Sequence, residues 1–434
     1  MEKYIKTEWQ KNNIAASSIK MDKIENQLEL LTNDLISKES KFNESIISVY
    51  EFGIKEGFNV NVEENTARFQ EMIDYCKNDK VISFPSGVFV FNSVDLGVNN
   101  NIAIEGSSSP FASFAQKNIY TGKFKDNYTR IYCNANKGET FLNHKGCILI
   151  ANNIAFYNTT KNSDGTFTNT EAKECVFMQH SRSDSAGKNV EKGKAFLHNC
   201  AFYGWKVVFG SDFTFQHLED EWSTGKVQDE YEYYKQSCVV ASKCRFTRNG
   251  IAVNQSVDGR LIDCSFNKND YAIVLRENSG FTTISNCRIE WNLYNGIYCE
   301  NAHEVTVSNC EFDCNGHAGL YAVGNTNSTF QGVFRRNGAR IETSDESRDD
   351  YINNVHIYAR QNINCNFIGS LTVVKPISDV GSAPQRPTNC SNFSENIKCI
   401  IKDNNLCGCT KGDKVDANKF ENNINCIIED NMHI

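Results

Sequence analysis

A short motif of cysteine, a polar residue and a large apolar residue recurs at nearly constant intervals through the middle of the chain. The cysteines of four successive copies, Cys244, Cys264, Cys287 and Cys310, are 20, 23 and 23 residues apart. Near the C-terminus, residues 393–401 are matched by residues 420–428, which lie 27 residues further on. Such a period, made of short strand-like runs, indicates coils of β-strands stacked on one another. We therefore expect an all-β solenoid with parallel strands.

One coil of the repeat contains three short runs of alternating character. In the coil around Cys310 these runs are residues 305–307, 310–312 and 319–322. Because side chains alternate along a strand, the motif's cysteine and the apolar residue two positions later point to the same, inner side. Asparagine precedes a cysteine at Asn199, Asn286, Asn309 and Asn389. We expect these asparagines to occupy left-handed turns and to stack their amides.

The chain carries 18 cysteines, and the repeat accounts for many of them as rungs of an interior thiol ladder. Zinc sites usually show two closely spaced cysteine pairs. Cys407 and Cys409 form one close pair, and Cys310 and Cys314 another, but neither has a second pair at such a spacing. We therefore predict structural thiols, with no metal and no cofactor.

Charge and hydropathy exclude several classes of partner. With 45 Lys and Arg against 53 Asp and Glu, the net charge is −8, which disfavours nucleic acid as a partner. No stretch is apolar for the roughly 18 to 20 residues that a membrane span needs, so we expect no membrane insertion. Charges and amides also interrupt every apolar run near the N-terminus, which predicts synthesis in the cytoplasm without a signal peptide.

The N-terminal segment shows a heptad seam formed by Met21, Ile24, Leu28, Leu31 and Leu35. The seam fits a parallel coiled coil, which we expect in a homotrimer, or a helix packed on its own domain. The stretch Tyr4-Ile5-Lys6-Thr7-Glu8-Trp9 and the run Ile24-Glu25-Asn26 resemble the start of tail and baseplate proteins of phages that infect Gram-positive bacteria. The usual Gly-Asp after the tryptophan is replaced by Lys11-Asn12-Asn13. The resemblance implies that residues 1–48 attach the protein to other tail proteins.

The following segment has the signature of a solenoid's first coils. Phe52-Gly53 precedes a helical pattern near 66–77 with an apolar face of Phe69, Met72, Ile73 and Cys76. Two strand-like runs, 81–84 and 88–91, then flank the turn formed by residues 85–87. This order resembles the opening of the pectate-lyase-like right-handed parallel β-helix family, in which such a helix caps the solenoid. We place the β-helix at 49–375, with an insertion near 206–237, and further coils at 376–434.

Candidate site residues follow from the expected alternation of the strands. If Ile289 and Phe312 point inward, Glu290 and Asp313 point outward on adjacent coils, where stacked carboxylates repel and can form a general acid/base pair. We add Arg276 and Glu300 as catalytic candidates. As sugar-binding candidates we take four aromatic residues: Trp291, Tyr298, Tyr321 and Trp222, the last lying in the insertion. The alternative interpretation is a solvated face with ordinary charges.

The function that we predict is that of a phage tail spike or tail-associated depolymerase, acting at the host cell surface as part of the virion. It would bind and cleave host surface polysaccharide, with glycoside hydrolysis preferred and β-elimination second. A lyase must neutralise a uronate carboxylate, for which Arg276 is the candidate. A non-catalytic receptor-binding or structural tail protein, and a bacterial polysaccharide lyase or epimerase, remain alternatives.

Overall fold

The computed structural model describes a solenoid of stacked coils together with the helix that closes one end. Residues 45–98, 100–108, 110, 128–134, 140–145, 147–161, 167–169, 174–179, 193–210, 238–254, 257–276, 279–338, 355–368, 371–373, 389–402, 405–407 and 419–429 are described. The predicted coiled coil and Trp222 lie outside these residues. None of the described helices has the length and apolar character required to cross a bilayer.

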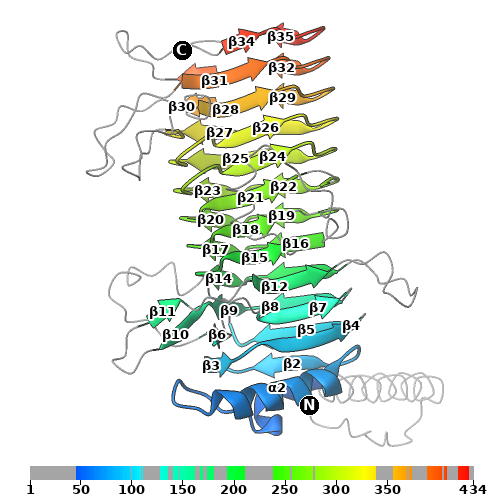
Figure 1. The fold of residues 1–434 in the computed structure, drawn as a ribbon, viewed down its shortest axis with the longest axis vertical. Helices are drawn as coiled ribbons and strands as arrows, with labels where there is room; N and C mark the ends of the chain where they lie inside the picture. Colours follow the sequence, from blue (N-terminus) through cyan, green and yellow to red (C-terminus); the bar gives the residue numbers. More distant parts are fainter. Residues whose placement is uncertain are drawn as a thin grey trace, which may run out of the picture.

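Each complete coil supplies three strands, which pair in parallel with the strands of the next coil (Figure 1). We call these the first, second and third strands of a coil. The first and second strands form one sheet: β1 Ile46–Ser48, β2 Val81–Phe84, β3 Gly87–Phe91, β5 Asn101–Gly106, β6 Thr129–Cys133, β8 Ile148–Asn152, β9 Ile154–Tyr157, β13 Lys194–His198, β14 Ala201–Tyr203, β16 Cys238–Ser242, β17 Arg245–Thr247, β19 Arg260–Ile262, β20 Ser265–Asn267, β22 Thr283–Ser285, β23 Arg288–Glu290, β25 Thr306–Asp313, β27 Thr329–Arg335, β29 Asn366–Ile368, β30 Leu371–Val373, β32 Ile400–Lys402, β33 Asn405–Cys407 and β35 Ile427–Glu429.

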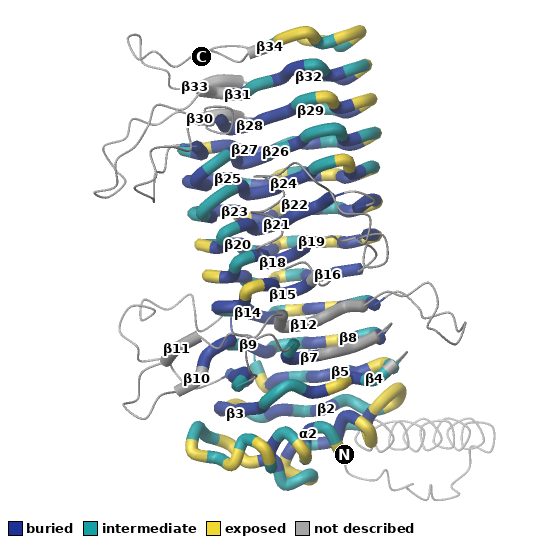
Figure 2. The backbone as a smooth tube through the Cα atoms, viewed as in Figure 1, coloured by how far each residue is buried: buried dark blue, intermediate teal, exposed yellow. Residues whose placement is uncertain are grey.

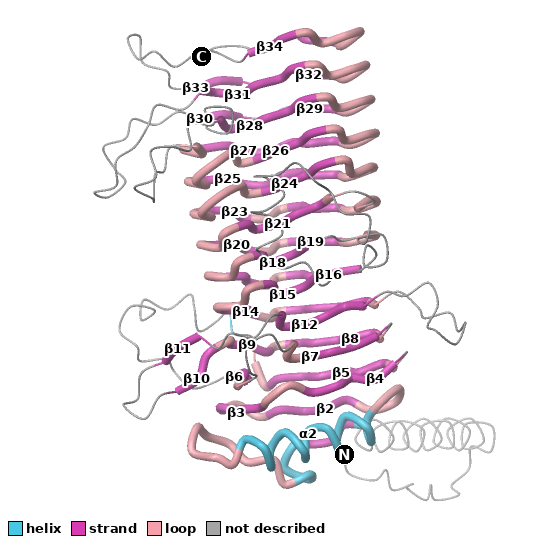
Figure 3. Tube along the Cα trace, viewed as in Figure 1, coloured by secondary structure: helices cyan, strands magenta, loops and turns pink. Residues whose placement is uncertain are grey.

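The third strands form a second parallel sheet. Its members are β4 Val94–Val98, β7 Leu142–Lys145, β12 Glu174–Gln179, β15 Val207–Gly210, β18 Ile251–Asn254, β21 Tyr271–Leu275, β24 Ile297–Glu300, β26 Leu320–Val323, β28 Val355–Arg360, β31 Asn389–Ser394 and β34 Lys419–Glu421. A small antiparallel hairpin, β10 Thr159–Lys161 with β11 Phe167–Asn169, lies outside both sheets. Strands of the first sheet such as β17 and β20 alternate buried and less buried positions, whereas third strands such as β18 and β21 are buried throughout, so the core runs along the solenoid axis (Figure 2). Figure 3 shows the strands of successive coils stacked along the same axis.

The repeat sets the register of the core, as the sequence predicted. Phe246, Phe266, Ile289 and Phe312 are partners on successive second strands, and all four are fully buried. The rings of Phe246 and Phe266 stack with centroids 4.8 Å apart and planes 4° from parallel. Identical side chains therefore pack on one another at the spacing of neighbouring strands, about 4.8 Å.

The cysteines are interior thiols. Fourteen cysteines of the described part of the chain are free, and of these only Cys426, in the last described coil, is not buried. Burial raises the pKa of Cys76 to about 11 and that of Cys314 to about 12, so these thiols stay protonated. The ladder predicted from the Cys244 repeat is present, and its sulfurs donate to backbone carbonyls of their own or the preceding coil.

Stacked asparagines are present, but they are not the ones expected. Asn199, Asn286 and Asn309 adopt the expected left-handed turns, with φ of 52°, 54° and 52°. Asn389 instead begins strand β31. The amide ladder is formed by asparagines that follow the second strand, and a second ladder follows the third strand. The first comprises Asn249, Asn269, Asn292, Asn315 and Asn337, and the second Asn325, Asn362, Asn396 and Asn423.

Each rung of the first ladder makes the same contacts. The backbone N–H and the side-chain Nδ2 of Asn269 both donate to Oδ1 of Asn292, each over 3.0 Å. Asn292 in turn donates from Nδ2 to Oδ1 of Asn315 over 2.7 Å. All three residues are fully buried. The ladder thus satisfies backbone donors at a corner, where the strand-to-strand hydrogen bonds of the sheet are interrupted.

The capping helix α2, Val62–Cys76, begins four residues before the expected start. Asn61 is its N-cap and accepts from the backbone N–H of Glu64 over 3.1 Å. Asn65, inside the helix, is buried, and its side chain bonds both the backbone N–H and the carbonyl of Lys55. The expected apolar face is buried against the first coil, where the ring of Phe69 stacks on Phe91 at 4.5 Å.

Removal of one ladder amide tests its contribution to stability. Asn292→Ala leaves two donors of Asn269 without their acceptor, and an unsatisfied buried donor costs about 1–3 kcal/mol. We expect a loss of at least about 2 kcal/mol in the free energy of unfolding, measured by urea denaturation. Asn101→Ala, at an exposed strand position, is the control. Equal midpoints for the two variants would contradict the ladder's role.

His356 ends the first ladder and predicts an acid-sensitive fold. Its Nδ1 accepts from Nδ2 of Asn337 over 3.3 Å, and burial lowers its pKa to about 4, while Asp313 acts weakly in the opposite direction. The unfolded histidine, with pKa near 6.5, then binds protons that the folded one excludes. Stability from this group is complete above pH 6.5 and falls by up to about 3 kcal/mol as the pH approaches 4. His356→Asn should flatten that part of the pH profile; an unchanged slope in urea titrations would refute this assignment.

Candidate functional site

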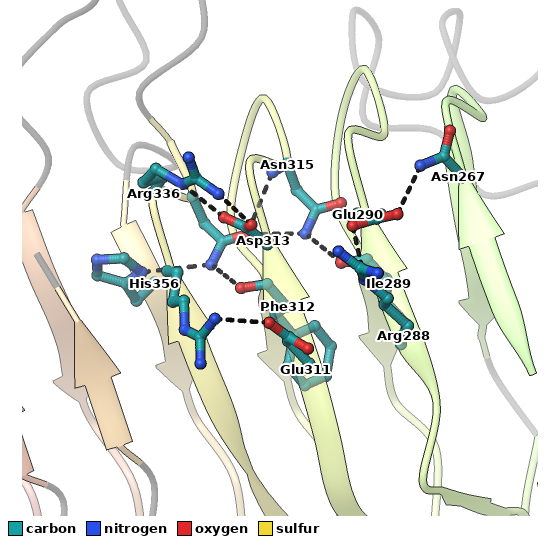
Figure 4. A network of polar contacts seen from close by, with 12 residues as sticks. Asn267, Arg288, Ile289, Glu290, Glu311, Phe312, Asp313, Asn315, Arg336 and His356 are labelled. Atoms are coloured by element: carbon teal, nitrogen blue, oxygen red, sulfur yellow. Dashed lines mark hydrogen bonds and ion pairs between the residues drawn. The ribbon is translucent and has the colours of Figure 1, made fainter. Parts of the chain in front are cut away.

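Glu290 and Asp313 lie side by side on the outer surface of adjacent second strands, as predicted (Figure 4). Glu290 ends β23 and Asp313 ends β25, and the two residues are register partners. Ile289 and Phe312, which precede them, point into the core. The alternation of the strands therefore fixes both carboxylates on the outside, immediately before the corner that leads to the third strand.

Each carboxylate has its own arginine. Glu290 pairs with Nε of Arg288 at 2.8 Å and accepts from Nδ2 of Asn267 at 2.8 Å. Asp313 is held by two nitrogens of Arg336, with Nε donating to Oδ1 over 2.8 Å and Nη2 to Oδ2. The residues are 9% and 4% exposed. We expected the two carboxylates to interact mainly with each other; the structure places a cation beside each, which offsets their repulsion.

A third pair of a carboxylate and an arginine lies two residues before Asp313 on the same strand. Glu311 pairs with Nη1 of Arg335 at 2.8 Å, and this pair is more exposed than that of Asp313 and Arg336. Three arginines thus balance three carboxylates within two neighbouring coils and the coil that follows them. Figure 4 shows the network as a row of side chains projecting from successive strands. In this hydrogen-bonded network both Glu290 and Asp313 already have partners.

Arg276, Tyr298 and Glu300 form a second group, on the sheet of third strands. Arg276 follows β21, whereas Tyr298 and Glu300 belong to β24. The hydroxyl of Tyr298 donates to Oε2 of Glu300 over 2.8 Å, and Nε of Arg276 lies 3.7 Å from the same oxygen. The guanidinium carbon of Arg276 lies 5.7 Å from the centre of the Tyr298 ring. The predicted site residues therefore divide into two groups, on different sheets.

The second group combines one partly exposed carboxylate with two buried partners. The side chain of Glu300 is 29% exposed and that of Arg276 is 10% exposed. Burial, followed by the charge of Glu300, raises the pKa of Tyr298, so its hydroxyl stays protonated and acts as a donor. The arrangement thus brings together a carboxylate that can accept a proton, a phenol that can donate one, and a cation.

A column of tyrosines extends from this group. Tyr298 stacks on Tyr321 with centroids 4.7 Å apart and planes 7° from parallel. Tyr358 continues the column at 5.2 Å from Tyr321. Sequence reasoning found the first two and missed Tyr358, which lies 37 rather than 23 residues after its partner. The signal that could have found it is the shared Tyr-Ala pair at 321–322 and 358–359.

Trp291 adopts a left-handed conformation, with φ of 58°, at the corner after Glu290, and is half-buried. Its role as a sugar platform stays a prediction, as do the catalytic roles of Glu290, Asp313, Glu300 and Arg276. Within the described part of the chain, no group of three or more His, Cys, Asp or Glu residues has a geometry that could hold a metal ion.

Comparison with known proteins shows a partial family match. The model of a family described as periplasmic copper-binding protein (NosD) matches residues 220–368, about a third of the chain. No curated protein matches the sequence. The match covers the coils that carry both groups of candidate residues.

Solved structures match over most of the chain. A DFA-IIIase of Arthrobacter chlorophenolicus A6, solved without its lid in complex with GF2, is 9% identical, with 87% of this chain and 94% of that chain covered and a TM-score of 0.51. The A-module of the Azotobacter vinelandii mannuronan C-5 epimerase AlgE6 is 10% identical, with coverage of 89% and 99% and a TM-score of 0.50. The fold is a right-handed parallel β-helix. ORF18 of Geobacillus virus E2 is 12% identical over 96% and 64%, with a TM-score of 0.43.

The two neighbouring arginines of the carboxylate network should differ in their effect on stability. Arg336→Ala leaves the buried Asp313 without its bidentate partner, and breaking such a buried pair costs about 3–5 kcal/mol. Arg335→Ala removes an exposed pair, which is worth at most about 1 kcal/mol. Urea denaturation of both variants measures the difference. Similar losses would show that Asp313 does not depend on Arg336.

Proposed function

We propose that this protein acts on an acidic polysaccharide and removes a proton from its uronate residues at the group Arg276, Tyr298 and Glu300. The observation that carries the proposal is the contact of the Glu300 carboxylate with both a protonated phenol and an arginine. A base, an acid and a cation are the three groups that proton abstraction next to a carboxylate requires.

The proposed step is a β-elimination. A carboxylate oxygen of Glu300 takes the proton from the ring carbon that bears the uronate carboxyl group, while Arg276 offsets the charge that develops on that carboxyl group. The electron pair released forms a carbon–carbon double bond, and the glycosidic carbon–oxygen bond breaks. The leaving oxygen takes the hydroxyl proton of Tyr298. The products are a shorter chain with a new hydroxyl end and one with an unsaturated uronate end.

Glycoside hydrolysis at Glu290 and Asp313 is the second candidate. Hydrolysis needs one carboxyl group that is protonated and one that is ionised. Glu290 and Asp313 are each paired with an arginine and their side chains are only 12% and 6% exposed, whereas that of Glu300 is 29% exposed, which is why we place elimination first. The fold shared with a mannuronan C-5 epimerase module agrees with a carbohydrate substrate but does not select the reaction.

The biological setting that we propose is the tail of a phage. Within residues 1–48, the stretches 4–9 and 24–26 resemble tail and baseplate proteins and a heptad seam is present, so this segment would attach a homotrimer to the virion. Three copies would multiply weak contacts with host surface polysaccharide. A non-catalytic receptor-binding protein on the same scaffold, and a bacterial lyase or epimerase, are the competing assignments.

The chemical roles predict which variants lose activity. Glu300→Gln and Tyr298→Phe should each lower the rate of polymer cleavage by about a hundredfold or more, because each removes one proton-transfer group. Glu304→Gln, which makes the same charge change at an exposed corner position four residues away, should retain the rate. The assay follows both new reducing ends and the ultraviolet absorbance of unsaturated uronate, on polygalacturonate, alginate and surface polymers of Gram-positive bacteria.

Three outcomes would contradict the proposal in different ways. Reducing ends without unsaturated product, lost in Glu290→Gln and Asp313→Asn, would assign hydrolysis to the first group. Binding without any cleavage would assign the receptor-binding role. A change of sugar configuration without cleavage would assign an epimerase.

A further inference from the structure

Phe281 is a large apolar side chain in an unfavourable and exposed position. Its ring is 53% exposed, and its backbone has φ of 50°, in the left-handed region. A bulky residue is rarely found there because its side chain crowds the backbone. Strain of this kind costs about 1–3 kcal/mol and is concentrated at functional sites.

The equivalent corner of other coils carries polar residues. The left-handed residue that follows each isolated bridge of this corner is Asp258, Phe281, Glu304, Asn327, Asn364, Lys398 or Asn425. Phe281 is thus the one apolar member of the column among the described residues. The turn requires only a residue that can adopt the left-handed conformation, and asparagine adopts it more readily than phenylalanine does.

The ring of Phe281 is held in place by its neighbours. It lies edge-to-face against His303, with ring centroids 5.2 Å apart and planes at 84°. The backbone N–H of Phe281 donates to the carbonyl of His303 over 3.3 Å. A methyl group on Gly280 would overlap the His303 imidazole, so the glycine makes room for this ring. The contacts with His303 and the glycine at position 280 therefore hold the Phe281 ring in a defined position at this corner.

The corner adjoins the proposed catalytic group. The backbone N–H of Ser279 donates to the carbonyl of Arg276 over 2.8 Å, and the N–H of His303 donates to the carbonyl of Ser279 over 3.1 Å. His303 lies three positions after Glu300, which limits the distance between their Cα atoms to about 10 Å. If one sugar ring of a polysaccharide binds against Phe281, a sugar about one or two units further along the same polysaccharide can therefore reach Glu300.

We propose that Phe281, supported by His303, is a stacking platform for a pyranose ring of the polysaccharide. The apolar C–H face of the sugar would pack on the exposed ring, as aromatic faces pack on other apolar surfaces. The platform positions the chain so that a neighbouring sugar reaches Glu300. This inference rests on the proposed function for its choice of ligand, but it concerns binding and requires no cleavage.

Binding experiments separate the platform from the chemistry. Affinity electrophoresis in gels that contain polygalacturonate, alginate or dextran measures retardation directly, with Glu300→Gln as the background so that the polymer is not cleaved. Phe281→Asn should weaken binding of the retarding polymer by roughly threefold to tenfold, the amount expected for one aromatic contact. Its thermal midpoint should stay the same or rise by about 2 °C, because asparagine relieves the left-handed strain.

Two controls define the result. Phe281→Tyr keeps the ring and should keep the binding, and Phe196→Ala, which removes another exposed phenylalanine on β13, should leave it unchanged. Loss of binding in Phe281→Asn alone supports the platform even if no polymer is ever cleaved, in which case only the proposed chemistry fails. Equal binding by Phe281→Asn, an equal loss in Phe196→Ala, or no retardation of the protein by any of the three polymers overturns the inference.

Discussion

The separation of hydrogen-bonded parallel strands, about 4.8 Å, is the constraint on which this structure depends. Each residue of a coil meets the equivalent residue of the next coil at that distance. Inside the solenoid the best neighbour for a flat or amide-bearing side chain is a copy of itself. Phe312 on Phe334, with ring planes 2° apart, and Asn292 on Asn315 are two solutions of this kind. The asparagine ladders extend the regular hydrogen bonding through the corners, where the sheets do not reach.

On the outside of the solenoid the same spacing brings like charges on adjacent coils close enough to repel. Glu290 and Asp313 occupy such positions. An arginine pairs with each carboxylate: Arg288 of the same coil with Glu290, and Arg336 of the next coil with Asp313. The group around Glu300 uses a different solution, in which the neighbours of the carboxylate are a phenol and one arginine. The side chain of Glu300 is 29% exposed, whereas that of Asp313 is 6% exposed.

Much of the fold can be predicted from the sequence because the repeat reports inward positions directly. The Cys244 motif gave the strand order, the buried phenylalanines and the interior thiols. The asparagine ladders were assigned to the wrong residues, since an asparagine that precedes a cysteine and one that follows the strand look alike without the turn geometry. Partners on the surface were harder to foresee. Arg336 contacts Asp313 although it lies 23 residues further along the chain. Phe281 is recognisable as a candidate binding residue only from its backbone angle and its contact with His303.

The helix α2 closes one end of the solenoid, and this protects the first coil from opening. At one end α2 covers the first coil with Phe69, Met72 and Ile73, all fully buried. An end coil that contacts only one neighbour holds roughly half the stacking of an interior coil. Because α2 takes the place of the missing neighbour of the first coil, the amide hydrogens of β2 and β3 should exchange more slowly than those of an uncovered end coil, and closer to the rates of the middle coils that carry the candidate residues.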